Sequence, residues 1–257
     1  MMLVMDVSNT VVTMGVLVGD NLQSTWRFST DVHKTSDEYG VLLMELFSHG
    51  GVKLSDIDHA VLGSVVPSLT ATFQEVCQRY LGTTALVVEA GIRTGVRILV
   101  DNPKEVGADR VVNSLAAFRI YGGPTIVIDF STATTFDAIS REGDYLGCVI
   151  SPGIGVASDA LFDRTAKLSR VELVRPKSAI GKNTVAAIQS GLIFGYVGLV
   201  EGIVVRMKRE LGGNARVIAT GGQADLIAKE TTMVEVVDQD LTLKGLKFIY
   251  ELNREGR

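Results

Sequence analysis

The sequence predicts an α/β protein that consists of two copies of one domain. Two segments repeat the same order of residue types: LVMDVSNTVVTMGV at residues 3–16 and IVIDFSTATTFDAI at residues 126–139. In each, an apolar run leads to an aspartate, a serine and then β-branched residues, which is typical of a strand, a turn and a second strand. Asp129 follows Asp6 by 123 residues (129 − 6) in a chain of 257. Such a period is too long for a solenoid repeat but fits a duplicated domain.

The first half has the pattern of three strands followed by alternating helices and strands. Residues 2–28 alternate in hydropathy and are broken at Ser8-Asn9 and at Gly19-Asp20-Asn21, which predicts a meander of three strands. A helix is expected where a Ser or Thr cap and early acids precede helical apolar spacing and Gly50-Gly51 ends the run. The remaining expected elements are a helix at 68–82 and strands at 59–67 and 84–90.

The second half repeats this scheme. Three strands are expected at 125–131, 134–140 and 144–151, followed by a helix from about residue 154, a long helix at 183–211, a strand at 215–222 and a last helix at 241–253. A linking helix is expected at 102–123, with Pro103 in its first turn. We therefore expect an N-terminal domain at residues 1–115 and a C-terminal domain at 116–257, each a mixed sheet of five strands flanked by helices.

Composition restricts the range of partners and compartments. The net charge is −4 with acids and bases interspersed, so no basic stripe for nucleic acid is expected. The mean hydropathy is +0.27, but we expect no apolar run close to the roughly 18 residues of a membrane span. Asp6 interrupts any signal-peptide core, which favours a cytoplasmic protein. Cys77 and Cys148 lie in apolar contexts and are expected to be buried thiols, and the histidines show no metal-ligand spacing with them.

Both strand-turn segments have chemistry suited to phosphate. Backbone N–H groups in a turn bind phosphate oxygens, while an adjacent carboxylate holds Mg²⁺ or K⁺ directly or through water. A single turn of this kind is more often an ordinary hairpin. Two copies, matched in position and followed by the same order of elements, favour a nucleotide held by a turn from each half, across a cleft between the domains.

Further motifs give the chain a family resemblance. The duplicated halves resemble the superfamily of acetate and sugar kinases, heat-shock chaperone ATPases and actin, whose ribonuclease H-like domains clamp ATP. The match extends to the motif series of type III pantothenate kinase over nearly the whole chain. The motifs read DVSNT at 6–10, NPKEVGADR at 102–110, DFSTATTFD at 129–137, SPGI at 151–154, IGKNTVAAIQSG at 180–191 and VIATGG at 217–222.

The resemblance implies phosphorylation of the primary hydroxyl of pantothenate by ATP, the first step of coenzyme A biosynthesis. It implies that Asp109 is the general base and that Arg110 binds an anionic group such as the pantothenate carboxylate, a role suited to its planar fork of donors. From GADR alone, both residues would be ordinary solvated residues of a helix start. The substrate-binding residues implied are Val100, Gly107, Ala108, Asp109, Arg110 and Thr184.

The resemblance also implies the cofactors and the assembly. ATP would be bound with Mg²⁺ at Asp6, and Asp129 would hold a monovalent cation, K⁺ or ammonium. In the family the residue matching Thr184 reaches the substrate from the partner subunit, which implies a homodimer built partly by the long helix. The ATP-binding residues implied are Asp6, Val7, Ser8, Asn9, Thr10, Val11, Val12, Thr13 and Thr132.

Five positions depart from the family pattern. Ser8 and Ser131 stand where the family has glycine, and Val100 stands where it has tyrosine. Ser169 in place of proline and Cys148 in place of glycine are minor departures. If the two turns need positive φ, a serine would cost roughly 1–2 kcal/mol at each. The larger expected effect is steric, because the serine side chain would obstruct ATP or contribute a hydroxyl contact. A lost tyrosine hydrogen bond would cost about 0.5–1.5 kcal/mol of binding. We expect a working kinase with altered affinity for ATP or pantothenate.

The sequence allows three other interpretations. GIGVAS at 153–158, with Glu172 beyond it, imitates a dinucleotide-binding fingerprint but ends in Ser158 and lacks a clear parallel βαβ unit. PKSAIGKNT lacks the first glycine and the Ser or Thr of a Walker loop. The third alternative is a catalytically weakened nucleotide-binding regulator on the same fold, which would bind ligand without turnover.

Overall fold

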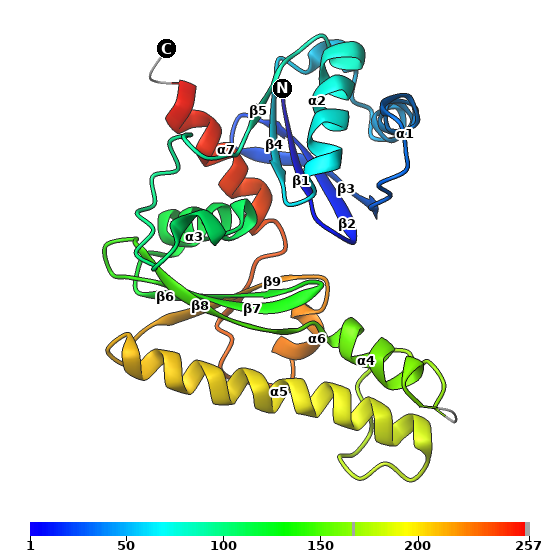
Figure 1. Ribbon diagram of the computed structural model, residues 1–257, viewed down its shortest axis with the longest axis vertical. Coiled ribbons are helices and arrows are strands. Elements are labelled where there is room, and N and C mark those ends of the chain that lie inside the picture. The colour runs from blue at the N-terminus through cyan, green and yellow to red at the C-terminus, as the bar shows by residue number, and fades with distance from the viewer. Residues whose placement is uncertain (166–167, 255–257) are drawn as a thin grey trace. The chain divides into compact units, whose positions relative to one another are not determined.

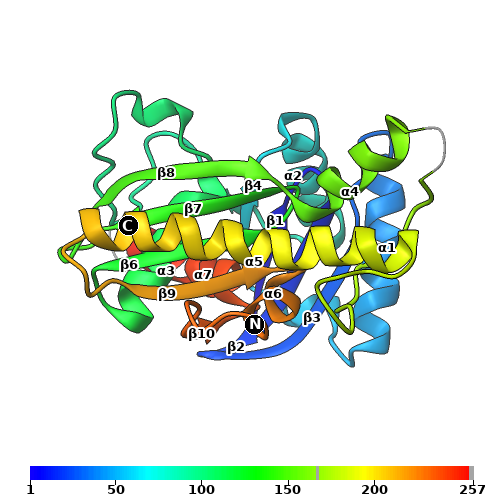
Figure 2. The same ribbon diagram turned by 90° about the horizontal axis from the view of Figure 1, so that it is seen from below.

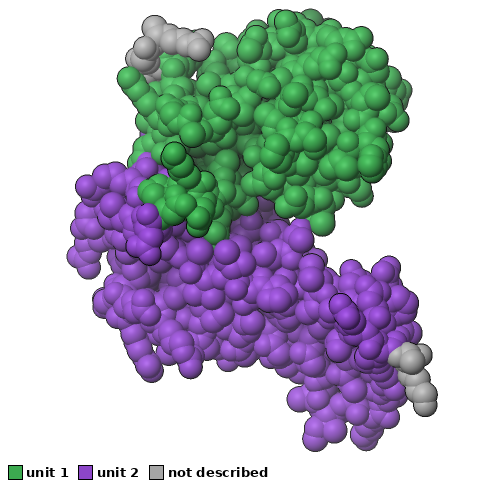
Figure 3. Space-filling model, viewed as in Figure 1, with its two compact units in different colours: residues 1–95, 102–116, 242–257 green, residues 96–101, 117–241 purple. Residues whose placement is uncertain are grey.

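The computed structural model describes residues 1–165 and 168–254 of the chain. The chain divides into two compact units (Figure 3). Unit 1 comprises residues 1–95, 102–116 and 242 onward, and unit 2 comprises residues 96–101 and 117–241. The last helix therefore belongs with the N-terminal unit, although the boundary expected at residues 115 and 116 stays a prediction.

Unit 1 contains one five-stranded mixed sheet with the strand order β3-β2-β1-β4-β5 (Figure 1). β1 is antiparallel to β2 and parallel to β4, so the meander and the following strand meet at β1. The strands are β1 (Met2–Val7), β2 (Val11–Val18), β3 (Asn21–Ser29), β4 (His59–Ser64) and β5 (Ala85–Val87). The helices are α1 (Ser36–His49), α2 (Pro67–Leu81), α7 (Leu241–Arg254) and two short 3-10 turns, Leu54–Asp56 and Pro103–Glu105. α3 (Ala108–Tyr121) begins in this unit.

Each helix of unit 1 begins and packs for local reasons. At α1, the Thr35 side chain accepts a hydrogen bond from the Glu38 backbone N–H and the Glu38 carboxylate accepts one from Thr35, so the expected capping box is formed. α1 and α2 bury a core of aliphatic and aromatic side chains that includes Tyr39, Phe47 and Phe73.

α7 packs closely against glycines of this sheet. An added Cβ at Gly15 would lie 2.9 Å from Leu243, and one at Gly63 would lie 3.0 Å from Leu246. The glycines therefore leave the space that the two leucines of α7 occupy.

Unit 2 repeats the same topology with the order β10-β9-β6-β7-β8. β6 is antiparallel to β7 and parallel to β9, as β1 is to β2 and β4. The two mixed five-stranded sheets confirm the predicted fold class. The elements are β6 (Thr125–Phe130), β7 (Ala133–Ile139), β8 (Tyr145–Pro152), α4 (Ile154–Asp163), α5 (Thr184–Glu210), β9 (Arg216–Gly221), α6 (Ala224–Ala228) and β10 (Val236–Val237).

The long helix α5 runs along one face of the unit 2 sheet (Figure 2). Its buried side chains include Ile193, Val200 and Val204, which pack with Ile126, Ile128 and other strand residues. An 18-residue window of α5 reaches a mean hydropathy of 1.7, and a third of that window (33%) is buried. By length and composition alone, this helix is long and apolar enough to cross a membrane. The expectation that no apolar run approaches the length of a membrane span was therefore wrong. The core helix of a soluble protein passes the same test.

Three further expectations were wrong in detail. The linking helix does not start near Pro103: a 3-10 turn at Pro103–Glu105 is followed by a break, and α3 begins at Ala108. Cys148 is exposed, because β8 alternates and this residue points outward, whereas Cys77 is buried as expected. The short elements α6 and β10 were not foreseen, since five and two residues carry too little periodicity to detect.

Candidate active site

The repeated strands place two aspartates at equivalent positions of the two sheets. Asp6 is the fifth residue of β1 and lies opposite Thr13 of β2 and Gly63 of β4. Asp129 is the fifth residue of β6 and lies opposite Thr135 of β7 and Thr220 of β9. Both side chains are only partly buried, and each lies one residue before a strand ends. The sequence repeat therefore corresponds to a structural repeat in strand register.

The turn after β1 is held by hydrogen bonds from two directions. The Ser8 backbone N–H donates to the Val11 carbonyl at 3.2 Å, which closes the turn. Thr30, just past the end of β3, donates its hydroxyl to the Ser8 carbonyl at 2.6 Å and its backbone N–H to the Thr10 carbonyl at 3.0 Å. Nothing in the sequence singled out Thr30. The turn is thus a fixed loop whose N–H groups have a defined direction.

The predicted ATP-binding residues of this turn differ in exposure. Asn9, Thr10 and Val11 are exposed, while Ser8 and Thr13 are partly buried. Val7 and Val12 are fully buried in the unit 1 core, so only their main chain can face a ligand.

Asp109 lies at the start of α3, where the preceding Gly107 makes room for its carboxyl group. A Cβ added at Gly107 would lie 2.5 Å from Asp109 Oδ1. The Asp109 carboxyl interacts with the backbone N–H groups of Asp109 and Arg110, as expected for an acid in the first turn of a helix. Gly107, Ala108, Asp109 and Arg110 are all partly buried. The GADR motif therefore forms a compact helix start around one carboxyl group.

Asp109 lies close enough to Asp6 for its negative charge to raise the pKa of Asp6. Burial is the largest cause, and the negative charge of Asp109 the second, of a rise in the Asp6 pKa from 3.8 to about 7; the hydrogen bond from Ser8 opposes it. Burial also raises the pKa of Asp109, while the N–H and the charge of Arg110 lower it. Two partly desolvated carboxyl groups in one site favour a proton or a cation between them.

This arrangement fits a magnesium ion bound together with a nucleotide. Among the described residues, no group of three or more His, Cys, Asp or Glu side chains is placed to hold a metal ion. Mg²⁺ in phosphoryl-transfer sites is commonly bound by one or two carboxylates, and phosphates and waters complete its shell. Asp6, with a neighbouring carboxyl group and an adjacent turn, meets that requirement.

The turn after β6 is one residue shorter and is packed by glycines. The Ser131 backbone N–H donates to the Ala133 carbonyl at 3.0 Å. A Cβ at Gly153, in the SPGI motif, would lie 2.4 Å from the carbonyl oxygens of Ser131 and Thr132. A Cβ at Gly221, where φ is +92°, would lie 2.5 Å from Asp129 Oδ1. The SPGI and VIATGG motifs thus leave space for the backbone and the carboxylate of the DFSTATT motif.

The two serines in place of family glycines cause no backbone strain. In the part of the chain that the structure describes, no residue other than glycine has a positive φ. The cost of positive φ considered for Ser8 and Ser131 therefore does not arise.

The two remaining predicted site residues, Val100 and Thr184, belong to unit 2 and lie far in sequence from the turns after β1 and β6. Val100 is partly buried and faces Gly147 of β8, whose added Cβ would lie 4.0 Å from it. Thr184 is exposed at the first position of α5, where Asn183 caps the helix by accepting from the Ala186 N–H at 2.9 Å.

The GIGVAS segment begins at Gly153, which is the N-cap of α4, but the strand before it, β8, pairs antiparallel with β7. The GIGVAS segment therefore lacks the parallel βαβ setting of a dinucleotide site.

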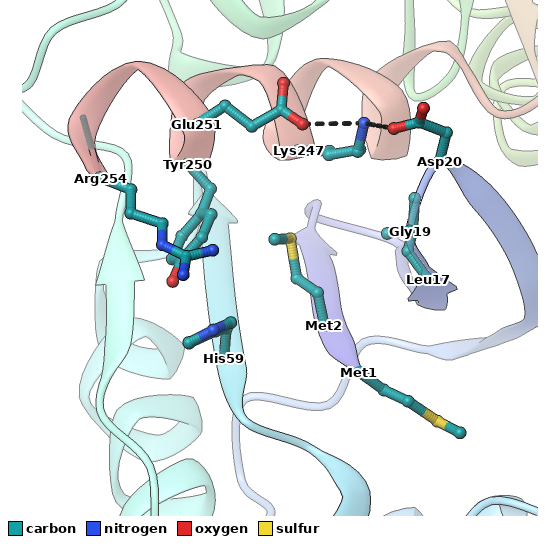
Figure 4. Close-up of a pocket in the computed structure, with 10 residues that line it drawn as sticks. All are labelled: Met1, Met2, Leu17, Gly19, Asp20, His59, Lys247, Tyr250, Glu251 and Arg254. Atoms are coloured by element: carbon teal, nitrogen blue, oxygen red, sulfur yellow. Dashed lines mark hydrogen bonds and ion pairs between the residues drawn. The ribbon is translucent and has the colours of Figure 1, made fainter.

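A cavity of about 280 Å³ in unit 1 contains none of the predicted site residues (Figure 4). Lys247 of α7 lies at its edge and pairs with Asp20 at 2.5 Å and with Glu251 at 2.8 Å. The rings of His59 and Tyr250 contact each other at a tilt of 34°, with their centroids 5.1 Å apart. Since its lysine is already paired with two carboxylates, we interpret this region as structural packing between α7 and the sheet.

Comparison with known proteins identifies the family. A family model described as type III pantothenate kinase matches residues 2–206. The chain belongs to the type III pantothenate kinase family. It is 53% identical to a type III pantothenate kinase of Moorella thermoacetica over 98% of this chain and 100% of that protein. It is 52% identical to one of Roseiflexus over 99% and 100% of the two chains. The activity of a type III pantothenate kinase is ATP-dependent phosphorylation of pantothenate, a kinase reaction of coenzyme A synthesis.

Solved structures agree on the fold of this type III pantothenate kinase chain. A Baf family protein from Campylobacter jejuni matches with a TM-score of 0.62 at 18% identity, over 98% of this chain and 99% of that one. The activator of 2-hydroxyisocaproyl-CoA dehydratase from Clostridium difficile matches with a TM-score of 0.53 at 11% identity, over 99% and 96%. At such identities the likeness shows the shared fold alone.

Replacing Gly107 by alanine (G107A) is expected to lower activity by about tenfold or more with little loss of stability. The added methyl would displace the Asp109 carboxyl, which is the end of a side chain that can rotate away, and misplacing a reacting group by about 1 Å can reduce the rate 100-fold. G155A is the matched control, because nothing lies within 4 Å of a Cβ there. Kinase turnover and melting temperature should be measured for both variants. Equal turnover in G107A and wild type would contradict the predicted role of Asp109 as the general base.

Replacing Asp6 by asparagine (D6N) is expected to stabilise the fold at neutral and alkaline pH. Because the folded pKa of about 7 exceeds the unfolded value of 3.8, the folded protein binds the extra proton between these values. The contribution of Asp6 to wild-type stability therefore falls as pH rises through that window and levels off above it. The free energy of unfolding of D6N should equal that of wild type below about pH 4 and exceed it by the order of a few kcal/mol above about pH 7. Melting curves of both proteins recorded across this pH range test the expectation. Stabilities of wild type and D6N that change in parallel with pH would refute it.

Proposed function

We propose that the turn after β1 and the start of α3 carry out phosphoryl transfer from ATP to pantothenate, with Asp109 as the general base. The observation that supports this most directly is the position of the Asp109 carboxyl. It is partly buried beside Gly107, lies near Asp6 and is held by the N–H groups of the helix start. Phosphoryl transfer depends mainly on positioning and charge, with a base to accept the hydroxyl proton, and these residues supply both.

The raised pKa of Asp109 suits it to this role. A carboxylate whose pKa lies above its usual value is a stronger base near neutral pH, and general base catalysis commonly contributes a factor of about 10²–10⁴. Asp109 would take the proton of the pantothenate hydroxyl as the oxygen attacks phosphorus. Arg110, the next residue, would bind the pantothenate carboxylate, and the charge of Arg110 keeps the pKa of Asp109 from rising further. Gly107, Ala108 and Val100 would complete the substrate contacts.

Asp6 and the turn that follows it would bind the ATP phosphates. The turn backbone from Ser8 to Thr10 is fixed by Thr30 and by closure onto Val11, which gives its N–H groups a set direction. Asp6 would hold Mg²⁺, which when bound neutralises charge on the transferred phosphoryl group. The affinity for Mg²⁺ should rise with pH, since the carboxyl must lose its proton to bind a cation.

Unit 2 would contribute the monovalent cation site and a further ATP contact. Asp129 occupies the position in unit 2 that Asp6 occupies in unit 1, and the missing side chain at Gly221 leaves room beside its carboxylate. We propose that Asp129 binds K⁺ or ammonium and that Thr132, which is exposed in the turn, touches ATP. We also propose a cytoplasmic homodimer in which Thr184 contacts the pantothenate bound to the partner subunit.

The alternative of a weakened regulator predicts ligand binding without turnover. Asp109 and Arg110, which turnover would require, are both retained at the helix start, and neither Ser8 nor Ser131 has a positive φ. A coupled assay for ADP release with ATP, Mg²⁺, pantothenate and K⁺ decides between the two. Turnover supports the kinase, and its absence in folded protein supports the regulator.

Replacing Asp109 by asparagine (D109N) is expected to reduce turnover by about 10²–10⁴ while leaving nucleotide binding intact, because the amide cannot accept the hydroxyl proton. D101N, at an exposed acid, is the control and should behave as wild type. The ADP-release assay measures turnover, and calorimetry measures binding of a non-hydrolysable ATP analogue. Near wild-type turnover in D109N would exclude Asp109 as the base.

The cation site is tested by repeating the wild-type assay with Na⁺ in place of K⁺, and then by repeating it with the D129N variant.

Mixing two inactive variants tests the contribution of Thr184 to the partner's site. If each site combines Asp109 of one subunit with Thr184 of the other, a D109N subunit paired with a T184A subunit retains one intact site. After subunit exchange, activity should recover to roughly a quarter of wild type. Light scattering should show a dimer throughout. No recovery, despite demonstrated exchange, would show that both residues serve the same subunit, and a monomer in light scattering would refute the homodimer itself.

A further inference from the structure

The two serines that occupy equivalent places in the repeated motif make different contacts. The Ser8 hydroxyl donates a hydrogen bond to Oδ2 of Asp6 at 3.2 Å. The Ser131 hydroxyl donates instead to the Ala133 carbonyl at 3.2 Å, so it closes its own turn. The structural repeat thus contains one serine that contacts the strand-end aspartate and one that does not.

Ser8 is itself held in place. Its backbone N–H donates to the Val11 carbonyl at 3.2 Å, and its carbonyl accepts the Thr30 hydroxyl at 2.6 Å. Its φ is not positive, so its backbone is unstrained. Because the backbone is fixed from both sides, the hydroxyl has a defined origin from which to reach the Asp6 carboxylate.

We propose that Ser8 is a positioning residue that orients the Asp6 carboxylate for a divalent metal ion. This inference rests on the proposed role of Asp6 in holding Mg²⁺. By occupying Oδ2, the hydroxyl fixes rotation of the carboxylate and leaves Oδ1 to face the metal. Mg²⁺ demands near-ideal octahedral geometry, so a freely rotating carboxylate binds it less well. Hydrogen-bond partners of metal ligands commonly change metal affinity by about 10- to 100-fold.

The same contact argues against a direct bond from Ser8 to phosphate. A serine hydroxyl has a single proton to donate, and the Asp6 carboxylate accepts it. Only oxygen lone pairs would then face an anionic phosphate, which is unfavourable. Ser8 should therefore influence the affinity for the metal ion rather than the affinity for nucleotide in the absence of metal.

The test compares Ser8→Ala with Ser131→Ala as the matched control. Binding of Mn²⁺ alone, followed by the loss of the free-ion signal in electron paramagnetic resonance, reports metal affinity without turnover. A second measurement is the Mg²⁺ concentration that gives half-maximal kinase rate at saturating ATP and pantothenate. We expect about a tenfold weakening in both for S8A and none for S131A. Ser8→Thr, which keeps the hydroxyl, should restore wild-type values. Circular dichroism and melting curves confirm that each variant is folded.

The outcomes separate failure of this inference from failure of the proposed function. If D6N loses Mn²⁺ binding while S8A binds as wild type does, Asp6 is the ligand and the positioning role of Ser8 is refuted. If D6N binds Mn²⁺ unchanged, the proposed role of Asp6 fails and the inference falls with it. If S8A changes only the affinity for metal-free ATP, the hydroxyl acts on nucleotide and the inference is wrong.

Discussion

The proximity of two carboxyl groups, Asp6 and Asp109, at a partly desolvated site is the constraint on which the rest of unit 1 depends. Burial and mutual repulsion disfavour two negative charges there, and the Asp6 pKa rises to about 7 as a result. The fold compensates locally: the Ser8 hydroxyl bonds one carboxyl, and the N–H groups of the α3 start bond the other. A cation supplied with the substrate would relieve the remaining repulsion. On the proposed function, this destabilising feature of the free protein favours the binding of nucleotide and metal.

The duplicated architecture gives two equivalent strand ends with different surroundings. In both sheets an aspartate lies one residue before the end of the central strand, opposite a threonine on the neighbouring antiparallel strand. The first turn has three residues and is tied to β3 through Thr30, whereas the second has two and is packed by Gly153 and Gly221. The differences lie almost entirely in what surrounds each aspartate. The different tasks proposed for the two aspartates thus go with differences in turn length and contacts on a shared strand register.

Most of the fold was predictable because its elements are long or strongly patterned. The meander, α1 with its capping box, α2 ending at Gly82 and the long α5 all follow from local signals. The start of α3 was placed too early, because Pro103 begins a 3-10 turn that the following residues do not continue. The exposure of Cys148 depends on which face of β8 meets solvent, and an apolar context cannot decide this.

The site residues were predictable from motifs, but their contacts were not. Asp6, Asp109 and Asp129 stand in recognisable segments, and strand register brings the repeated ones to equivalent places. The role of Gly107 depends on the conformation of the Asp109 side chain two residues on, and that of Thr30 on a hydrogen bond to a turn far earlier in the sequence. No linear pattern encodes either contact. The different hydrogen bonds of Ser8 and Ser131 likewise depend on a one-residue difference in turn length.

The packing of α7 onto the first sheet has a consequence for how the chain is made. Leu243 and Leu246 fill the spaces above Gly15 and Gly63, yet more than 170 residues of intervening sequence are synthesised between them. The strands of unit 1 leave the ribosome long before α7 is synthesised. The apolar face that α7 covers therefore stays exposed until that helix is made. During synthesis, unit 2 can complete its core before α7 covers the strands of unit 1.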